Sequence, residues 1–441
     1  MAEGRSQRGG WFCPSFCLLL LHLRLGAQNT PMRHLREFAR SGHPPTLASA
    51  FLYFDVSFMV WVLLGPLGMY VAEGLHLSAA EKGLLAAVPL LGGSLFRLIL
   101  GPLADRFGGR RIGLLGLGLT LLPLLLGWLW ADSLPQMLLV GLLLGVAGGS
   151  FAVALPLASR WYPAEHQGLA MGIAGAGNSG TLLATLFAPR LAEKVGWHGV
   201  FGLAILPIAA VGLLFLLLAR DSPHSGPRTS LAEYVRVLRE PDTLWFCLLY
   251  SLTFGGFVGL ASFLSVFFHD QYGVSKVHSG DLTTLCVLSG SFLRPVGGYL
   301  ADRLGGLRML QCLLAAVCVL ALLIGRFPPV AVVTVLFFFL MAVLGMGNGS
   351  VFQLVPQRFR REIGAITGLV GAAGGVGGFF LPSLMGAIQG STGSFAWGFA
   401  LLAGYAALAC FVISFKSRSW TWASLRTVTP EMGGLSTESA R

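Results

Sequence analysis

Charge is scarce in this sequence. Only 11% of its 441 residues are Asp, Glu, Lys or Arg, whereas 55% are hydrophobic; a globular protein carries roughly 25% charged residues. Apolar runs of about 20 residues, the length that a helix needs to cross a bilayer, recur along almost the whole chain. Within lipid the backbone must be hydrogen-bonded inside helices. The composition therefore excludes a water-soluble domain and predicts an all-α integral membrane protein.

The sequence also lacks the patterns of an enzyme or a metalloprotein. Its seven cysteines are an odd number, and none has the close paired spacing of a zinc site or a disulfide framework. We find neither a nucleotide-binding nor a catalytic motif. The formal net charge of +11 comes from basic residues that follow helix ends and do not form one exposed cluster. We expect no catalytic residue, no metal, no cofactor and no nucleic-acid partner; the surroundings are membrane lipid.

The apolar runs define twelve candidate membrane helices. Their approximate limits are 48–71, 79–103, 112–130, 136–159, 167–189, 197–219, 243–268, 279–301, 309–326, 330–355, 364–388 and 394–415. The longest polar gap divides six helices from six. We therefore predict two pseudo-symmetric six-helix halves in a monomer. The predicted divisions are a leader (1–46), the N-terminal half (47–219), a cytoplasmic central loop (220–242), the C-terminal half (243–415) and a cytoplasmic tail (416–441).

The positions of the basic residues predict the orientation. Outside the spans, five lie on one set of helix ends and all the others lie on the opposite set. The five are Lys82, Arg190, Lys194, Lys276 and Arg326. Because positive charge marks the cytoplasmic side, we expect both termini and the central loop in the cytoplasm.

The first 31 residues allow two interpretations. Their apolar stretch, Trp11 to Leu21, resembles the hydrophobic part of a signal peptide but is too short to span a bilayer. The second interpretation is that Met32 is the true start and that a basic cytoplasmic leader precedes the first span.

The two halves share related phrases. RLILGPLADRFGG begins at Arg97, and RPVGGYLADRLGG begins 197 positions later at Arg294. A second pair links GLAMGIAGAGNSG (168–180) with GAITGLVGAAGGVG (364–377). Such repeats imply a pseudo-twofold axis along the membrane normal and a substrate site near the midplane where the halves face each other. This arrangement is typical of a carrier.

Each of the two arginines lies deep in a predicted span. Each precedes an aspartate at the helix end by eight residues, which places it about 12 Å deeper at a rise of 1.5 Å per residue. A charged side chain at this depth costs about 2.5 to 3.5 kcal/mol on insertion scales. An arginine near a helix end can instead snorkel to the headgroups. Two equivalent charges facing one pathway would repel each other, and a bound anion would relieve that repulsion.

The motifs also carry a family resemblance. GPLADRFGGRR and GYLADRLGGLR resemble the cytoplasmic loop signature of the major facilitator superfamily. Together with GIAGAGNSG, GLVGAAGGVGG and the paired arginines, they resemble the nitrate/nitrite porter family over about residues 47–415. The resemblance implies a multi-pass plasma membrane protein whose substrates are nitrate and nitrite.

Candidate site residues follow from these features. We expect Arg97 and Arg294 to bind the anion. The rings of Phe151 and Phe352 would form the walls of the site. Tyr250 would supply a hydroxyl, and Asn178 would be a further hydrogen-bonding group. Further pocket or gating candidates are Phe254, Gly175, Gly177, Gly371, Gly374 and Asn348. The glycines also have a plainer interpretation, since small residues allow membrane helices to pack closely. The candidates for a cytoplasmic gate are Asp105, Arg106, Arg110, Asp302 and Arg303, which could equally be a solvated basic loop.

Uptake of an anion into a cell requires a source of energy. Moving a monovalent anion into a cell against 100 mV costs about 2.3 kcal/mol, so the carrier needs a driving partner. Asp55 is the one clear carboxylate inside a span and is the candidate for proton coupling, although it could simply pair with an arginine. We favour nitrate uptake with protons and keep nitrate/nitrite exchange open. A major facilitator carrier for another small anion and a transporter-like membrane sensor are also compatible with the sequence.

Overall fold

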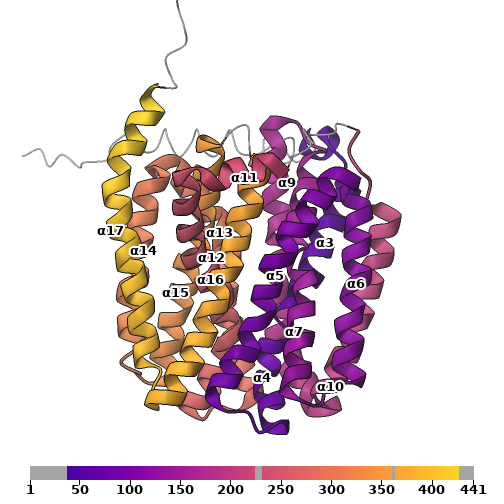
Figure 1. Ribbon diagram of the computed structural model, residues 1–441, viewed down its shortest axis with the longest axis vertical. Coiled ribbons are helices and arrows are strands. Elements are labelled where there is room, and N and C mark those ends of the chain that lie inside the picture. Colours follow the sequence, from indigo (N-terminus) through magenta and orange to yellow (C-terminus); the bar gives the residue numbers. More distant parts are fainter. Residues whose placement is uncertain (1–36, 224–230, 360–362, 427–441) are drawn as a thin grey trace, which may run out of the picture.

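The computed structural model describes residues 37–223, 231–359 and 363–426, and every regular element in these ranges is helical. In Figure 1 the helices of the N-terminal half (indigo to magenta) lie on one side, and those of the end of the chain (orange to yellow) lie on the other. Short connections join neighbouring helices at both ends of the bundle. The interface between the two groups runs along the length of the molecule.

The elements are named as in Figure 1. The first part of the chain forms α3 (Pro44–Trp61), α4 (Leu64–Gly74), α5 (Ala79–Phe107), α6 (Gly109–Leu129), α7 (Leu134–Gly148), α8 (Phe151–Ser159), α9 (Ala164–Gly175), the 3₁₀ turn η1 (Ala176–Ser179) and α10 (Gly180–Leu218). The second part forms α11 (Leu231–Arg239), α12 (Pro241–Tyr272), α13 (Lys276–Leu304), α14 (Gly306–Ile324), α15 (Val330–Arg358), α16 (Ile363–Thr392) and α17 (Ala396–Arg426).

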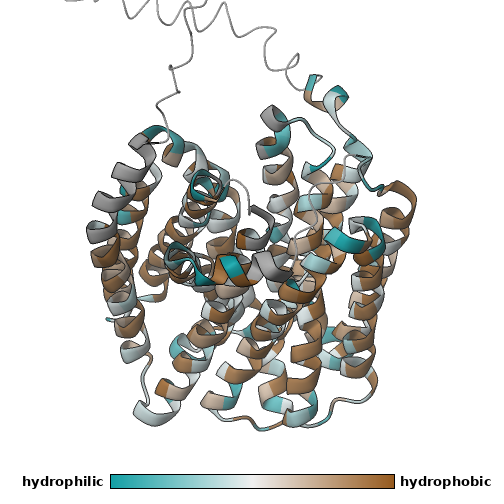
Figure 2. Cartoon of the chain, turned by 45° about the horizontal axis from the view of Figure 1, so that its top comes forward, coloured by the Kyte–Doolittle hydropathy of each residue, from teal (hydrophilic) through white to brown (hydrophobic). Residues whose placement is uncertain are grey.

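Within the described ranges, 10 helical segments are long and apolar enough to cross a membrane. One of them, residues 169–218, contains a non-helical residue, Gly196, with a φ of 71°, so it bends sharply there. The helix predicted at 279–301 exists as α13 but is too polar to be one of the ten. Figure 2 shows hydrophobic residues along most of the helices and hydrophilic ones mainly toward the helix ends and on α11. The count of twelve spans stays a prediction.

Three of the predicted continuous helices are interrupted. The helix predicted at 48–71 breaks after Trp61, and the one at 136–159 breaks before Phe151. The one at 167–189 contains the 3₁₀ turn η1. A short stretch of 3₁₀ helix within a longer helix often marks a functional hinge. Each interruption adjoins a residue of the site described below. Hydrophobic periodicity alone did not reveal these interruptions.

Glycines allow the central helices to approach closely. A Cβ on Gly92 of α5 would lie 2.2 Å from the carbonyl oxygen of Leu142 in α7. A Cβ on Gly83 of α5 would lie 2.4 Å from the carbonyl oxygen of Pro382 in α16. Real Cβ atoms do not approach other atoms so closely, so both positions require glycine for this packing. The contact of α5 with α16 joins the two halves, and the candidate site lies along it.

Candidate anion site

Arg97 is buried in the protein interior, with 1% of its surface exposed. Its Nε donates to the carbonyl of Gly148 (3.0 Å), and its Nη1 donates to the carbonyl of Gly371 (2.6 Å). The second bond crosses to α16 of the C-terminal half. Nη2 is buried and has no hydrogen-bond partner in the described part of the chain. A side chain held in this way is turned into the protein, which argues against snorkelling to the headgroups.

Arg294 is less enclosed. Its side chain is half-buried, and its Nη2 lies 3.5 Å from the Tyr250 hydroxyl. Its Nη1 is buried without a partner among the described residues. In the same ranges neither arginine forms an ion pair with a carboxylate, so both guanidinium groups keep N–H donors and a positive charge for another acceptor.

Aromatic rings enclose the two guanidinium groups. Phe151 lies between them, with its ring centroid 5.2 Å from Cζ of Arg97 and 5.9 Å from Cζ of Arg294. Phe352 lies 5.8 Å from Cζ of Arg294 and meets the Tyr250 ring edge-on at 4.9 Å. Phe254 stacks on Tyr250 at 5.0 Å and lies 5.1 Å from Cζ of Arg97. The structure thus brings together the two arginines and the four predicted aromatic residues.

The pair of phenylalanines is not a parallel sandwich. The Phe151 and Phe352 rings are 6.1 Å apart and inclined by 58°. Instead, both guanidinium groups lie near the Phe151 ring. An aromatic face attracts a cation without neutralising it. The rings therefore supply dry walls that leave the positive charge available.

Two buried amides have unsatisfied polar atoms. Asn178 lies in η1 and Asn348 in α15, and each is 1% exposed. Neither the amide oxygen nor the amide nitrogen of either residue has a hydrogen-bond partner in the described ranges. Leaving a buried polar atom unpaired costs about 1 to 3 kcal/mol. Both residues therefore have donors and acceptors free for a ligand or water.

The predicted glycines differ in their surroundings. A Cβ on Gly374 would lie 2.7 Å from the Tyr250 ring, and a Cβ on Gly177 would lie 2.8 Å from the Phe54 ring. At Gly371 the nearest atom, on Phe151, would be 3.6 Å away, and at Gly175 nothing lies within 4 Å. Glycine is therefore required sterically at the first two positions and not at the other two.

Asp55 is 9% exposed and accepts a hydrogen bond from Ser179 Oγ at 2.6 Å. The alternative expectation was that Asp55 simply pairs with an arginine. No arginine pairs with it in the described part of the chain. Its backbone also packs against η1 and the first residue of α10. A Cβ on Gly177 would lie 2.9 Å from the backbone nitrogen of Asp55, and a Cβ on Gly180 would lie 1.8 Å from its carbonyl oxygen. Asp55 thus joins α3 to the interrupted helix that carries Asn178.

The loop residues predicted as a cytoplasmic gate make contacts within their own halves or with the start of the central loop. Asp105 accepts from Arg160 Nη2 at 2.5 Å, and Asp302 accepts from Gln353 Nε2 at 2.8 Å. The backbone N–H of Arg110 donates to Asp221 (2.9 Å). The guanidinium groups of Arg106 and Arg303 lie over the rings of Phe107 and Tyr299. None of these contacts joins the two halves, so the gate stays a prediction.

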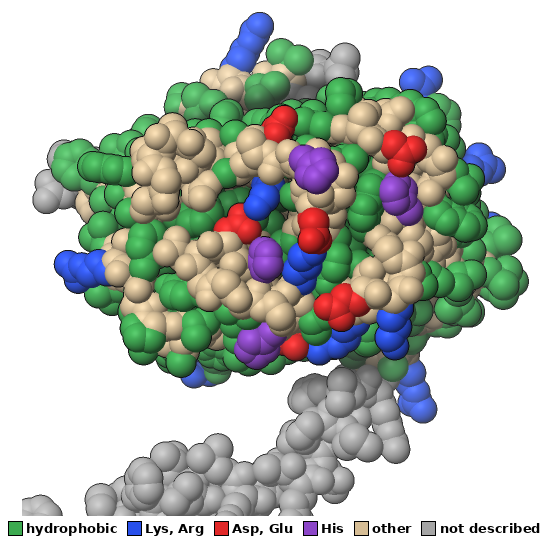
Figure 3. Space-filling model, turned by 90° about the horizontal axis from the view of Figure 1, so that it is seen from below, with side chains coloured by type: hydrophobic (Ala, Val, Ile, Leu, Met, Phe, Trp, Pro, Cys, Tyr) green, Lys and Arg blue, Asp and Glu red, His purple; other side chains and the backbone are tan. Residues whose placement is uncertain are grey.

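The opposite end of the molecule has ion pairs that sequence analysis missed. Three of those in the described ranges join the N-terminal half to the C-terminal half. They are Glu73 with Lys276, Lys82 with Asp270 (2.9 Å) and Arg190 with Asp281 (2.7 Å). Figure 3 views this end and shows acidic and basic side chains side by side near its middle. The only sequence signal was that these basic residues were exceptions to the positive-inside pattern.

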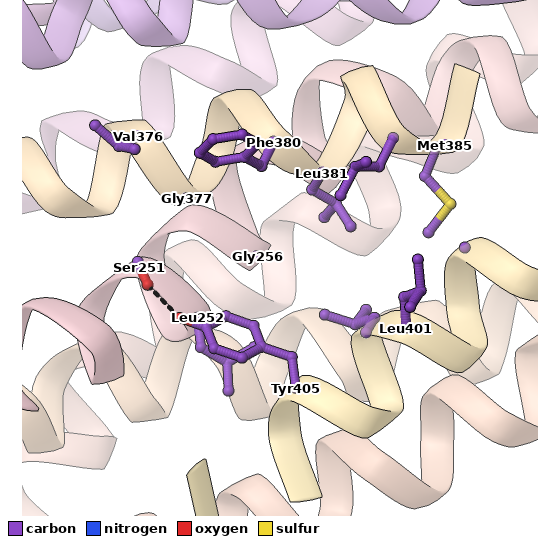
Figure 4. Close-up of a pocket in the computed structure, with 13 residues that line it drawn as sticks. Ser251, Leu252, Gly256, Val376, Gly377, Phe380, Leu381, Met385, Leu401 and Tyr405 are labelled. Atoms are coloured by element: carbon purple, nitrogen blue, oxygen red, sulfur yellow. Dashed lines mark hydrogen bonds between the residues drawn. The ribbon is translucent and has the colours of Figure 1, made fainter. Parts of the chain in front are cut away.

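A separate cavity of about 410 Å³ lies between α12, α16 and α17 (Figure 4). The 13 residues that line it include no charged side chain. Its polar groups are the hydroxyls of Ser251 and Tyr405, which lie 2.6 Å apart and hydrogen-bond to each other. An apolar cavity is unsuited to a small anion, so the region around the two arginines is the candidate anion site.

Comparisons with known proteins show which family the chain resembles. Residues 49–382 match the model of the Major Facilitator Superfamily. The probable nitrate/nitrite transporter NarK2 of Mycobacterium tuberculosis is 36% identical over 373 residues, covering 82% of this chain and 94% of that protein. The nitrite extrusion protein of Bacillus subtilis is 35% identical over 358 residues (81% and 90%). The probable nitrate/nitrite antiporter NarK1 of Thermus thermophilus is 33% identical over 374 residues (78% and 84%).

A solved structure shares the fold. It is a bacterial homologue of the human lysosomal transporter Spinster in an inward-facing and unoccupied conformation. Its TM-score is 0.60 at 18% sequence identity, and the alignment covers 86% of this chain and 96% of that one.

The family match and these relatives therefore show that the chain is a membrane carrier of the major facilitator superfamily and not an enzyme. Within that superfamily, the chain belongs to the nitrate/nitrite porter family, and it is a multi-pass protein of the plasma membrane.

Proposed function

We propose that this carrier transports nitrate and nitrite by alternating access, with the anion held between Arg97 and Arg294. The observation that carries the proposal is that each of the two guanidinium groups keeps a buried, unpaired nitrogen and lacks a carboxylate partner in the described ranges. A small planar anion can accept charge-assisted hydrogen bonds from both arginines while the surrounding rings exclude water. The names of the similar proteins from Mycobacterium tuberculosis and Bacillus subtilis point to the same substrates.

We extend this proposal to the membrane topology. Twelve spans with cytoplasmic termini follow if α13 and both arms of the segment bent at Gly196 cross the bilayer. The two halves, 47–219 and 243–415, then move relative to each other around the anion.

We propose nitrate uptake with proton cotransport as the coupling mode. Exchange for internal nitrite is the second candidate, because no carboxylate pairs with either arginine in the described part of the chain. Nitrate-evoked current in proteoliposomes separates the two modes. Inward positive current that grows with an inward pH gradient indicates more than one proton per nitrate. Absence of current, with a requirement for internal nitrite, indicates exchange.

Substrate identity has its own test. In the same vesicles, unlabelled nitrate and nitrite should compete with labelled nitrate at lower concentrations than chlorate or formate. Stronger competition by formate or chlorate would favour a carrier for another small anion.

Replacing Asp55 with Asn tests the proton-coupling role. If Asp55 carries the coupled proton, we expect pH-driven nitrate uptake to fall by about tenfold or more, since an amide cannot take up and release that proton. Exchange of external nitrate for internal nitrite should continue in the same variant. Ser179→Ala is the control, because it removes the hydrogen bond to Asp55 and keeps the carboxylate. Unchanged pH-driven uptake by Asp55→Asn would exclude Asp55 as the coupling group.

A further inference from the structure

Trp61 is the last residue of α3, at the point where the first predicted span is interrupted. Its side chain is fully buried. The following residues, Val62 and Leu63, make turn hydrogen bonds before α4 begins at Leu64. Nothing in the hydropathy or in the repeats singles out this tryptophan.

The indole ring is fixed in one orientation. Its Nε1 donates to the carbonyl of Pro89 in α5 at 2.6 Å. A Cβ on Gly93 or on Gly148 would lie 2.5 Å from atoms of the ring, so these two glycines form a slot that fits it. The ring also meets Phe58 edge-on, with centroids 4.9 Å apart. A ring held by a hydrogen bond and by packing on several sides is a rigid surface for whatever lies on its face.

The guanidinium of Arg97 lies on that face. Its Cζ is 4.8 Å from the Trp61 ring centroid, closer than to either Phe151 or Phe254. Gly148, which makes room for the indole, also accepts the hydrogen bond from Arg97 Nε. Indole is the strongest of the aromatic partners for a cation. The ring, two carbonyls and two further rings thus set the plane of the guanidinium and leave Nη2 unpaired.

We propose that Trp61 is a positioning residue for anion binding: it orients Arg97 so that Nη2 donates to the anion. The inference rests on the proposed function, because it assumes that the anion binds at Arg97. An aromatic face suits this role better than a carboxylate, since it stabilises the buried cation without neutralising the charge that the anion needs. Trp61 also adjoins the interruption between α3 and α4, so the orientation of Arg97 is linked to the geometry of this break.

The test compares Trp61→Met and Trp61→Leu with Trp61→Phe in proteoliposomes. Met and Leu remove the aromatic face, and we expect the KM for nitrate to rise by about tenfold with a much smaller change in maximal rate. Phe keeps an aromatic face and loses the hydrogen bond to Pro89, so it should recover most of the affinity. Using both Met and Leu keeps the test valid if one variant does not fold.

Phe201→Leu is the matched control. Phe201 is also a fully buried aromatic residue of the N-terminal half, but it packs near Trp197 and Gly127. We expect the KM of Phe201→Leu for nitrate to stay within about twofold of the wild-type value. We also expect nitrate to raise the thermal unfolding midpoint of the wild-type protein and of this control.

Two results separate the inference from the proposed function. If wild-type protein neither transports nitrate nor is stabilised by it, the proposed function fails. If wild-type protein does both and the Met and Leu variants keep its KM, Trp61 does not position Arg97. A loss in which Phe is as impaired as Leu would also overturn the inference, because the aromatic face would then not be the feature that matters.

Discussion

Nitrate uptake should fall by at least about 30-fold when either Arg97 or Arg294 is replaced with Lys. Disrupting a buried, hydrogen-bonded charge contact typically costs about 2 to 5 kcal/mol, and 1.4 kcal/mol corresponds to a factor of ten. Lysine keeps the positive charge but cannot reproduce the fork of Arg97, which bonds two carbonyls and still has Nη2 for the anion. Initial rates of labelled nitrate uptake by proteoliposomes measure the effect.

The two variants should lose nitrate uptake for different reasons. Arg97→Lys removes a cross-half bond to Gly371 as well as an anion donor, so we expect some loss of thermal stability. In the described ranges the Tyr250 hydroxyl, at 3.5 Å, is the one hydrogen-bond partner of the Arg294 side chain, so its replacement should impair uptake with little loss of stability. Arg111→Lys is the control, because Arg111 is exposed. Near-normal uptake by both site variants would exclude the arginine pair as the anion site.

Sequence analysis selected residues that lie together in the structure, but it did not predict how the candidate site is shaped. Arg97, Arg294, Phe151 and Tyr250 were chosen from a repeat, from their depth and from a family resemblance, and the structure brings them together. Periodicity did not reveal that helices break next to Trp61 and Phe151. Apolar residues continue across the first break, and the second lies at Gly149 and Ser150 inside a longer apolar run. The inclination of Phe151 to Phe352 depends on how α8 and α15 cross, which no local pattern records.

Contacts between residues distant in sequence could not be predicted either. The partners of the pairs that join the halves lie about 90 to 200 residues apart in sequence, and each partner alone is an ordinary charge at a helix end. Trp61 similarly gains its role only from Pro89, Gly148 and Arg97, which other helices supply. By contrast, Gly374 and Gly177 could be predicted, because runs of glycine in an apolar helix indicate close packing before the partner helix is known.

The three ion pairs across the halves lead to the second large prediction. All three pairs are at least partly exposed to water. Ion pairs between exposed side chains contribute only about 0 to 1 kcal/mol each, so pairs of this kind can hold two surfaces together and still separate during a transport cycle. At the same end, α5 and α16 are in close contact. Alternating access requires that this end open whenever the site faces it. A covalent link across the interface should therefore stop transport without disturbing the site.

Ala79 in α5 and Gly390 in α16 are suited to such a link. A Cβ on Gly390 would lie 3.9 Å from the Cβ of Ala79, and disulfides have Cβ atoms about 3.5 to 4.5 Å apart. We expect the double variant Ala79→Cys, Gly390→Cys to form a disulfide under mild oxidation and to lose more than about 90% of nitrate uptake, because one side of the cycle becomes inaccessible. Reduction with dithiothreitol should restore the uptake. Cross-linking is measured by the shift in electrophoretic mobility after cleavage of the chain between residues 79 and 390.

The design needs two controls. The native cysteines are first replaced with alanine in a background that still transports, and each single variant, Ala79→Cys or Gly390→Cys, must transport equally well when oxidised or reduced. Nitrate should still raise the thermal unfolding midpoint of the oxidised double variant if the site can be reached from the other end, since the link lies outside it. Full uptake by protein that is completely cross-linked would mean that α5 and α16 need not separate at this end. The ion pairs there would then stabilise the fold and would not form a closure that opens in the transport cycle.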